Sequence, residues 1–226
     1  MVTMPTPDTI AGTTIAFSFI LLGNAITQSF MGVPALLVDF PRPSSPDHPR
    51  AARLLGRQWP IFWQVGNIFF RPISTLGILG YGYTAFSAWR YASAVASNNG
   101  WHTALIPAHG QVEKGNWKIW GVCAVCHLIT VVHSAMNMQP LNAKLEGLSS
   151  AAEVVNGKDK RVDENGAALG TAKGKGGGVD VSLAEYYARR WIKLNLLRAL
   201  MPLVAGTLGL WQSLGAKEVP VQGVIV

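Results

Sequence analysis

The chain has 226 residues and a net charge of +7, yet only 14% of its residues are charged, against roughly 25% in an average soluble domain. Its hydrophobic fraction is 49%. Four windows carry no charge at all: 10–31, 72–89, 119–143 and 199–216. A helix needs about 20 such residues to cross the hydrocarbon core of a bilayer. The composition therefore excludes an ordinary soluble domain and predicts a membrane protein.

The fold class that follows is all-α, a four-helix transmembrane bundle that forms one domain over residues 1–226. We expect helices at about 10–31, 59–93, 117–138 and 191–213, with a bend in the second around Pro72. The third should end at Pro140. Residues 149–179 are rich in Gly, Ala, Lys and Asp and nearly free of large apolar side chains. Such a stretch cannot bury a core, so it predicts a long disordered loop between helices three and four.

Basic residues predict the orientation of these helices. The first loop (32–58) and the third loop (139–193) together hold thirteen Lys and Arg residues, and the opposite side holds four. We therefore expect loops one and three in the cytosol and both termini in the lumen. The N-terminal stretch lacks a basic region and a small-residue cleavage site, which predicts an uncleaved first span in the endoplasmic reticulum or vesicles derived from it. Anionic lipid headgroups account for the net positive charge, and no nucleic-acid partner is needed.

Polar side chains recur at helical spacing within the apolar windows. In the third helix Cys126, Thr130, His133 and Asn137 fall on one face, because they are spaced by four, three and four residues. Polar groups are costly in lipid, so these stripes should face the bundle interior, as packing contacts or as a site. The other helices carry comparable stripes: Asn24 and Gln28 in the first, Arg57, Gln64, Asn67, Arg71 and Ser74 in the second, and Trp191, Asn195 and Arg198 in the fourth.

The segment Cys123-Ala-Val-Cys126-His127 matches the C-x-x-C-H pattern of c-type haem attachment. Haem attachment needs an exposed segment, whereas this one lies in an apolar helix. A second interpretation is a thiol pair that exchanges electrons with a quinone, but known membrane enzymes of that kind use further cysteines, and this chain has two. The interpretation we favour is that both cysteines pack as small, soft side chains.

Three short motifs resemble the DUF1772 family, and in particular its fungal anthrone oxygenase branch. They are G-R-x-W at 56–59, H-x-x-x-N followed by P-x-N-x-x-L at 133–145, and R-W-x-x-x-N-x-x-R at 190–198. The resemblance covers nearly the whole chain except the predicted loop. Many relatives have His in the last motif where this chain has Asn195, which shifts the role of a base to His133.

The resemblance implies a monooxygenase that converts the C10 methylene of an anthrone-type aromatic polyketide to a carbonyl, with O₂ as co-substrate. The sequence has no G-x-G-x-x-G fingerprint and no convincing metal-ligand set, so we expect no cofactor and no metal. A cofactor-free route is chemically reasonable, because C10 deprotonation gives an electron-rich anion that reduces O₂ directly. The protein must then supply a base, an oxyanion stabiliser and a dry, flat pocket.

The residues that this resemblance places in the site come from all four helices. His133 is the predicted base, Arg198 and Asn195 bind the oxyanion, and Asn137 and Asn142 orient the base or the substrate. The predicted substrate-binding residues are Gln28, Arg57, Trp59, Trp63, Asn67, Asn142 and Trp191. Expected partners are the polyketide, membrane lipid and other enzymes of a polyketide pathway.

Alternative functions remain open at the level of sequence. One is a non-catalytic membrane scaffold whose polar stripes only hold helices together. Another is the thiol/quinone redox protein that would use Cys123 and Cys126. A carrier is disfavoured because carriers are usually built from duplicated halves, and this chain shows no internal repeat.

Overall fold

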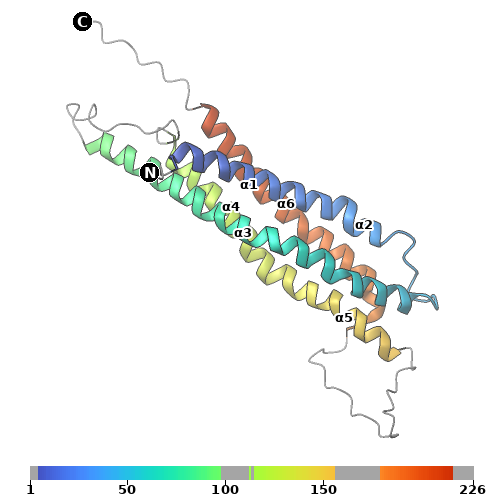
Figure 1. The fold of residues 1–226 in the computed structure, drawn as a ribbon. Helices are drawn as coiled ribbons and strands as arrows, with labels where there is room; N and C mark the ends of the chain where they lie inside the picture. Colours follow the sequence, from blue (N-terminus) through green and yellow to red (C-terminus); the bar gives the residue numbers. More distant parts are fainter. Residues whose placement is uncertain (1–4, 98–111, 113–114, 156–178, 216–226) are drawn as a thin grey trace, which may run out of the picture. The chain divides into compact units, whose positions relative to one another are not determined.

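The computed structural model describes residues 5–97, 112, 115–155 and 179–215 (Figure 1). This part of the chain is helical throughout apart from short connections, and contains no strand. It divides into two compact units, each built from parts of all four long helical stretches. Unit 1 comprises Met1–Asn24, Phe70–Val132 and Leu197–Val226, and unit 2 comprises Ala25–Phe69 and His133–Leu196.

The predicted all-α fold with four long helical stretches is confirmed. The first stretch consists of α1 (Pro7–Thr27), a π-helical turn (Gln28–Gly32) and α2 (Val33–Leu36). The second is α3 (His48–Ser97), and the third consists of α4 (Trp117–His133), a π-helical turn (Ser134–Met138) and α5 (Gln139–Val155). A 3₁₀ turn (Val181–Leu183) leads into α6 (Ala184–Gly215). Three stretches, Pro7–Leu36, Trp117–Ala151 and Val181–Gly215, are long and apolar enough to cross a membrane.

The expectation that the third helix ends at Pro140 was wrong, because a π-helical turn accommodates the proline. The backbone N–H of Gln139 donates to the carbonyl of Ser134, five residues back. In a regular α-helix the ring of Pro140 would collide with the carbonyl of Met136, and the wider turn removes that conflict. The same device occurs in the first stretch, where Val33 N–H donates to Gln28 and Pro34 follows. In each case the proline stands two residues after the π turn.

Other helix boundaries also differ from the expected ones. The second helix begins at His48 rather than near 59, and its 50 residues continue through Pro60 and Pro72 without interruption. The fourth begins at Ala184 instead of 191. Part of the predicted loop is helical, because α5 extends to Val155. Residues 156–178, the remainder of that loop, lie outside the described part of the chain.

The core of unit 2 forms where α2, α3, α5 and α6 bury their apolar faces together. Its members are Val33, Leu37, Ala52, Leu55, Trp59, Met138, Leu141, Leu145, Leu148, Ala184, Ala188 and Trp191. The glycine of the G-R-x-W motif explains how closely α3 and α5 approach. A Cβ on Gly56 would collide with the backbone nitrogen of Ser149 and with Leu148. Only glycine therefore fits at this crossing.

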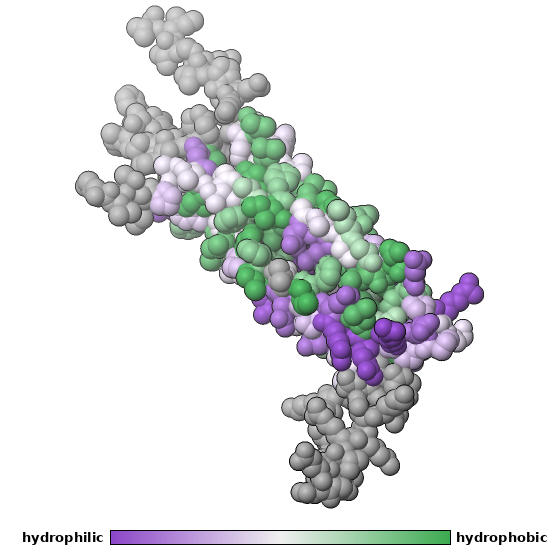
Figure 2. Space-filling view, turned by 45° about the vertical axis from the view of Figure 1, so that its right-hand side comes forward, coloured by the Kyte–Doolittle hydropathy of each residue, from purple (hydrophilic) through white to green (hydrophobic). Residues whose placement is uncertain are grey.

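Unit 1 is packed in the manner of membrane helices, by small residues that let backbones approach. Its core consists of Ala11, Ile15, Tyr81, Ala88, Val112, Trp120, Cys123, Cys126 and Ala205. On α6, a Cβ on Gly206 would press on Phe19, and one on Gly209 would press on Ile15. Large apolar side chains such as Leu79, Phe86 and Val125 are exposed along these helices. Apolar surface of this kind, green in Figure 2, suits contact with lipid rather than water.

Candidate active site

Two buried tryptophans of unit 2 share one hydrogen-bond acceptor. The indole N–H groups of Trp59 on α3 and Trp191 on α6 both donate to Oδ1 of Asn142 on α5, at 3.2 and 2.8 Å. The two rings meet edge to face, with centroids 5.4 Å apart and planes at 88°. The structure thus brings these three predicted substrate-binding residues together. It uses them to join three helices, because both lone pairs of the amide oxygen are occupied by the protein.

His133, the predicted base, lies where α4 gives way to the π turn and is nearly buried. Its Nε2 lies 3.0 Å from the carbonyl oxygen of Leu194, and its Nδ1 lies 3.0 Å from the side-chain amide nitrogen of Asn137. A carbonyl oxygen only accepts, so Nε2 carries the proton and Nδ1 is the basic nitrogen. The predicted pairing of His133 with Asn137 is therefore present. Asn137 itself is exposed, so the amide covers Nδ1 from outside.

Asn195 is fully buried and joins α6 to the first helical stretch. Its Nδ2 donates to the carbonyl of Ala25 at 3.1 Å and to the hydroxyl of Ser29 at 2.9 Å. The residue before Ser29, Gln28, lies against α3 at Gly66: a Cβ there would be 2.6 Å from the Gln28 amide nitrogen. The residue before Asn195 is Leu194, which accepts from His133. One chain of contacts therefore links His133, Asn195, Gln28 and the α3 segment around Gly66.

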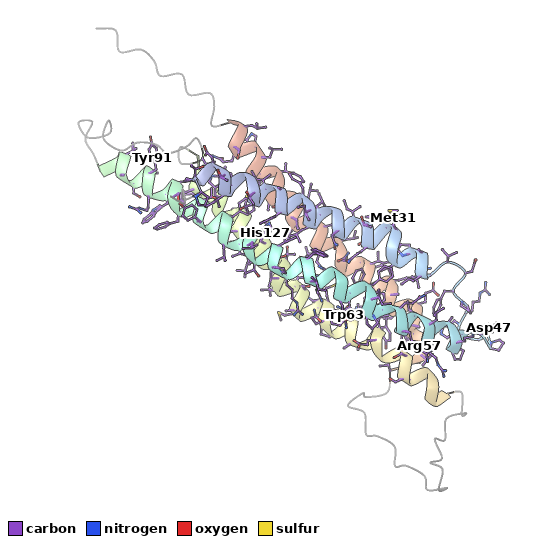
Figure 3. All side chains as sticks on the ribbon, in the orientation of Figure 1. Met31, Asp47, Arg57, Trp63, Tyr91 and His127 are labelled. Carbon is purple, nitrogen blue, oxygen red and sulfur yellow. The ribbon has the colours of Figure 1, made fainter. Side chains whose placement is uncertain are left out.

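Four buried polar atoms of these linked residues and of the α3 segment around Gly66 lack a hydrogen-bond partner in the described part of the protein. Two are acceptors, Oε1 of Gln28 and Oδ1 of Asn195, and two are donors, Nε1 of Trp63 and Nδ2 of Asn67. Trp63 and Asn67 are four residues apart on α3, on either side of Gly66, and Figure 3 marks Trp63 on that helix. Buried polar groups are nearly always paired, so a cluster of unpaired ones indicates a place where a ligand supplies the partners. We name these four residues the unpaired polar cluster.

Arg57 and Arg198 are the remaining predicted site residues. The side chain of Arg57 is exposed on the first turns of α3, two residues from the buried Trp59 and therefore on another face (Figure 3). Arg198 belongs to unit 1, where its guanidinium carbon lies 3.7 Å from the centroid of the Phe70 ring. Arg198 is buried, its Nε has no partner, and no described carboxylate pairs with it. A buried cation over an aromatic face is a second position that favours an anionic group.

The C-x-x-C-H segment is buried in unit 1. Both cysteines are free thiols, and Cys123 donates to the carbonyl of Ala205 at 3.4 Å. Nε2 of His127 lies 2.9 Å from the hydroxyl of Ser18, which lies 3.0 Å from the hydroxyl of Tyr81. The His127 ring fills the space beside Gly77, where a Cβ would collide with it. This burial leaves no room for a covalently attached haem and favours the packing role.

Sequence reasoning missed Ser29 and Gly66 in unit 2 and the contacts of His127 in unit 1. Ser29 is one turn beyond Ala25 and next to Gln28, so the polar stripe of the first helix pointed near it. Gly66 carries no side chain and gave no signal except its position between Trp63 and Asn67. Among the described residues, no group of three or more His, Cys, Asp and Glu is arranged to hold a metal ion.

Long apolar helices and a buried, partly unpaired polar cluster define a helical membrane protein with a candidate small-molecule site. A family model described as anthrone oxygenase matches residues 59–208, two thirds of the chain. The chain therefore belongs to this family, the DUF1772 family that the three motifs resemble. Family membership supports an oxygenase-like role. Comparisons with curated proteins and with solved structures gave no match.

Proposed function

We propose that this protein is a membrane oxygenase that converts an anthrone-type aromatic polyketide to the anthraquinone, without a cofactor. The observation that carries the substrate class is the unpaired polar cluster: two buried acceptors and two buried donors. A hydroxyanthrone offers hydroxyl groups, which would pair with Gln28 and Asn195, and a keto oxygen, which would accept from Trp63 and Asn67. A ligand with only donors or only acceptors would leave half of the cluster unpaired, at about 1–3 kcal/mol for each group.

The tryptophans then have two different roles. The N–H groups of Trp59 and Trp191 donate to Asn142, so these two residues hold together the helices that carry the site. Trp63 is half-buried and its N–H is unpaired, so it is the tryptophan suited to contact the substrate. Its ring would lie against a planar aromatic ligand while the N–H donates to the keto oxygen.

The reaction consumes one O₂ and releases one water. Nδ1 of His133 accepts the C10 proton, and the resulting anion, its charge spread onto the former keto oxygen, gives one electron to O₂. The carbon radical and superoxide combine at C10, and the peroxide anion takes the proton back from His133. The hydroperoxide then loses water as the second C10 proton leaves and the O–O bond breaks, forming the carbonyl. One oxygen atom of O₂ therefore becomes the new carbonyl oxygen of the anthraquinone, and the other leaves as water.

Asn137 has a defined part in this proposal. Its amide occupies Nδ1 of His133, so the amide must turn away before Nδ1 accepts a proton. Asn137 is exposed, so its amide can turn toward the surface, and this movement breaks the hydrogen bond to Nδ1 of His133. The Leu194 carbonyl meanwhile holds Nε2–H and fixes the tautomer that leaves Nδ1 basic. Arg198, a buried cation, is proposed to stabilise the negative charge that develops on the substrate.

The test is oxygen uptake by the purified, metal-stripped chain in detergent with emodin anthrone, with anthraquinone followed by absorbance. His133→Gln should lower kcat by about 10²–10⁴-fold, the usual range for loss of a general base. Trp63→Phe and Asn67→Leu should raise KM. Arg198→Gln should lower kcat at unchanged KM. The exposed Arg190→Gln serves as a control at wild-type rate.

Thermal unfolding of each variant separates this proposal from a scaffold. If His133→Gln unfolds at a lower temperature but oxidises the anthrone at the wild-type rate, the histidine is a packing residue and the base assignment is wrong. If the wild-type protein is folded and gives no rate above the spontaneous reaction, the anthrone is not its substrate.

A further inference from the structure

A cleft of about 520 Å³ opens at the start of α3 in unit 2 and is not part of the candidate active site. Three arginines line it, Arg50, Arg53 and Arg57, together with Asp47 and Leu54. Figure 3 labels Asp47 and Arg57 at this end of the helix. The arginines are spaced by three and four residues, so they project from one face of α3.

The charge of the cleft selects for a doubly charged anion. Three guanidinium groups and one carboxylate give its lining a formal charge of +2. A phosphate monoester carries about −1.5 to −2 at pH 7, whereas a phosphodiester carries one charge. Arginine also matches phosphate oxygens in geometry, because its planar fork donates two parallel hydrogen bonds.

The apolar part of the cleft indicates that the anion is attached to a lipid. Leu54 lies between Arg50 and Arg57 on the same face and is 55% exposed. From residue 58 the helix carries no charge until Arg71. Ile61, Ile68 and Phe69 of this segment are exposed and suit contact with lipid, and an arginine cluster beside such apolar surface is where a headgroup would meet the membrane surface. The exposed leucine would make no favourable contact with a soluble inorganic anion.

The wall of the cleft is held in place by backbone contacts. His48 is buried, with Nδ1 lying 2.7 Å from the carbonyl of Pro41, which lines the cleft, and Nε2 lying 3.0 Å from the carbonyl of Val181. Phe40 packs edge to face on the same imidazole, with centroids 5.5 Å apart. His48 thereby lies between the connection before α3 and the turn before α6 and contacts both.

We propose that this arginine cleft binds the headgroup of a membrane lipid that carries a phosphate monoester. A second cleft in unit 2, lined by Glu185, Tyr186, Arg189, Arg190 and Lys193, provides a built-in comparison. It has the same formal charge of +2. Its two arginines, Arg189 and Arg190, are adjacent in sequence and so project from different faces of α6, whereas Arg50, Arg53 and Arg57 share one face of α3. Net charge alone therefore does not distinguish the two clefts, whereas the arrangement of the arginines does.

The experiment uses the full chain in neutral detergent, with dioctanoyl phosphatidic acid, dioctanoyl phosphatidylcholine and inorganic phosphate as probes. Binding is measured by native mass spectrometry and by the rise in Tm. Phosphatidic acid should bind the wild type and the Arg190→Gln/Lys193→Gln control equally, and about tenfold or more weaker when Arg50, Arg53 and Arg57 are all changed to Gln. Phosphatidylcholine and inorganic phosphate should give no shift.

Two further variants keep the test decisive if the triple variant fails to fold. Asp47→Asn raises the charge of the lining to +3 and should tighten binding, and Arg50→Gln alone should weaken it. Equal binding of phosphatidic acid by all variants would overturn the proposal. Inorganic phosphate that shifts Tm as much as the lipid does would assign the cleft to a soluble anion, which would also overturn it.

Discussion

Asn142 offers the sharpest test of how the candidate site is built, because sequence and structure give it different roles. Changing Asn142 to Ala removes the acceptor for two buried indole N–H groups, those of Trp59 and Trp191. A buried donor left unpaired costs about 1–3 kcal/mol, so the two together should lower the free energy of unfolding by about 2–6 kcal/mol. For a chain of this size that corresponds to a fall in Tm of about 4–24 °C.

The assay is thermal unfolding in detergent, with anthrone oxidation measured on the same preparations. Asn142→Asp is the matched control, since a carboxylate oxygen still accepts from both indoles and most of the loss should be avoided. The opposite pattern would refute the reasoning. If Asn142→Ala keeps the wild-type Tm and raises only KM, the amide contacts substrate and does not hold the tryptophans.

Three further predictions follow from particular contacts. Gly56→Ala should lower Tm, because its Cβ would collide with the α5 backbone. Gly82 has open space around it, so Gly82→Ala should raise the free energy of unfolding by up to about 1 kcal/mol. Equal changes in Tm for the two variants would contradict the close approach of α3 and α5. Gly66→Ala should displace the Gln28 amide and raise KM at nearly constant Tm, measured by steady-state oxygen uptake. Replacing both Cys123 and Cys126 by Ser should leave turnover intact, since both are buried and free; lost turnover in folded protein would revive the thiol/quinone alternative.

The charge-free windows were enough to predict four helices, because an uncharged stretch of about 20 residues has the length of a helix that crosses a bilayer. Helix ends were less predictable. A proline ordinarily stops a helix. Here the helix continues through Pro140 because the Gln139 N–H donates to the Ser134 carbonyl in a π-helical turn, and no residue pattern in the sequence predicts that bond. The turn before Pro34 was missed for the same reason.

The candidate site was predictable in its residue types and less so in its pairings. The i, i+4 spacing of His133 and Asn137 predicted their contact, because it is local to one helical stretch. That Asn142 serves two tryptophans from α3 and α6 depends on tertiary packing, so sequence spacing could not reveal it. Arg57 was grouped with Trp59 by the motif, but two residues along a helix turn a side chain by about 200°.

The two π-helical turns also constrain how this chain can change during evolution. Each turn accommodates one residue more than an α-helical turn, which rotates everything after it by about 100°. Deleting that residue would turn Leu141, Leu145 and Leu148 away from the unit 2 core and return Pro140 to a collision with a carbonyl. Losing the proline alone would remove the reason for the wide turn. The extra residue of each π turn and the proline that follows it therefore depend on each other, and we expect relatives either to have both or to lack both.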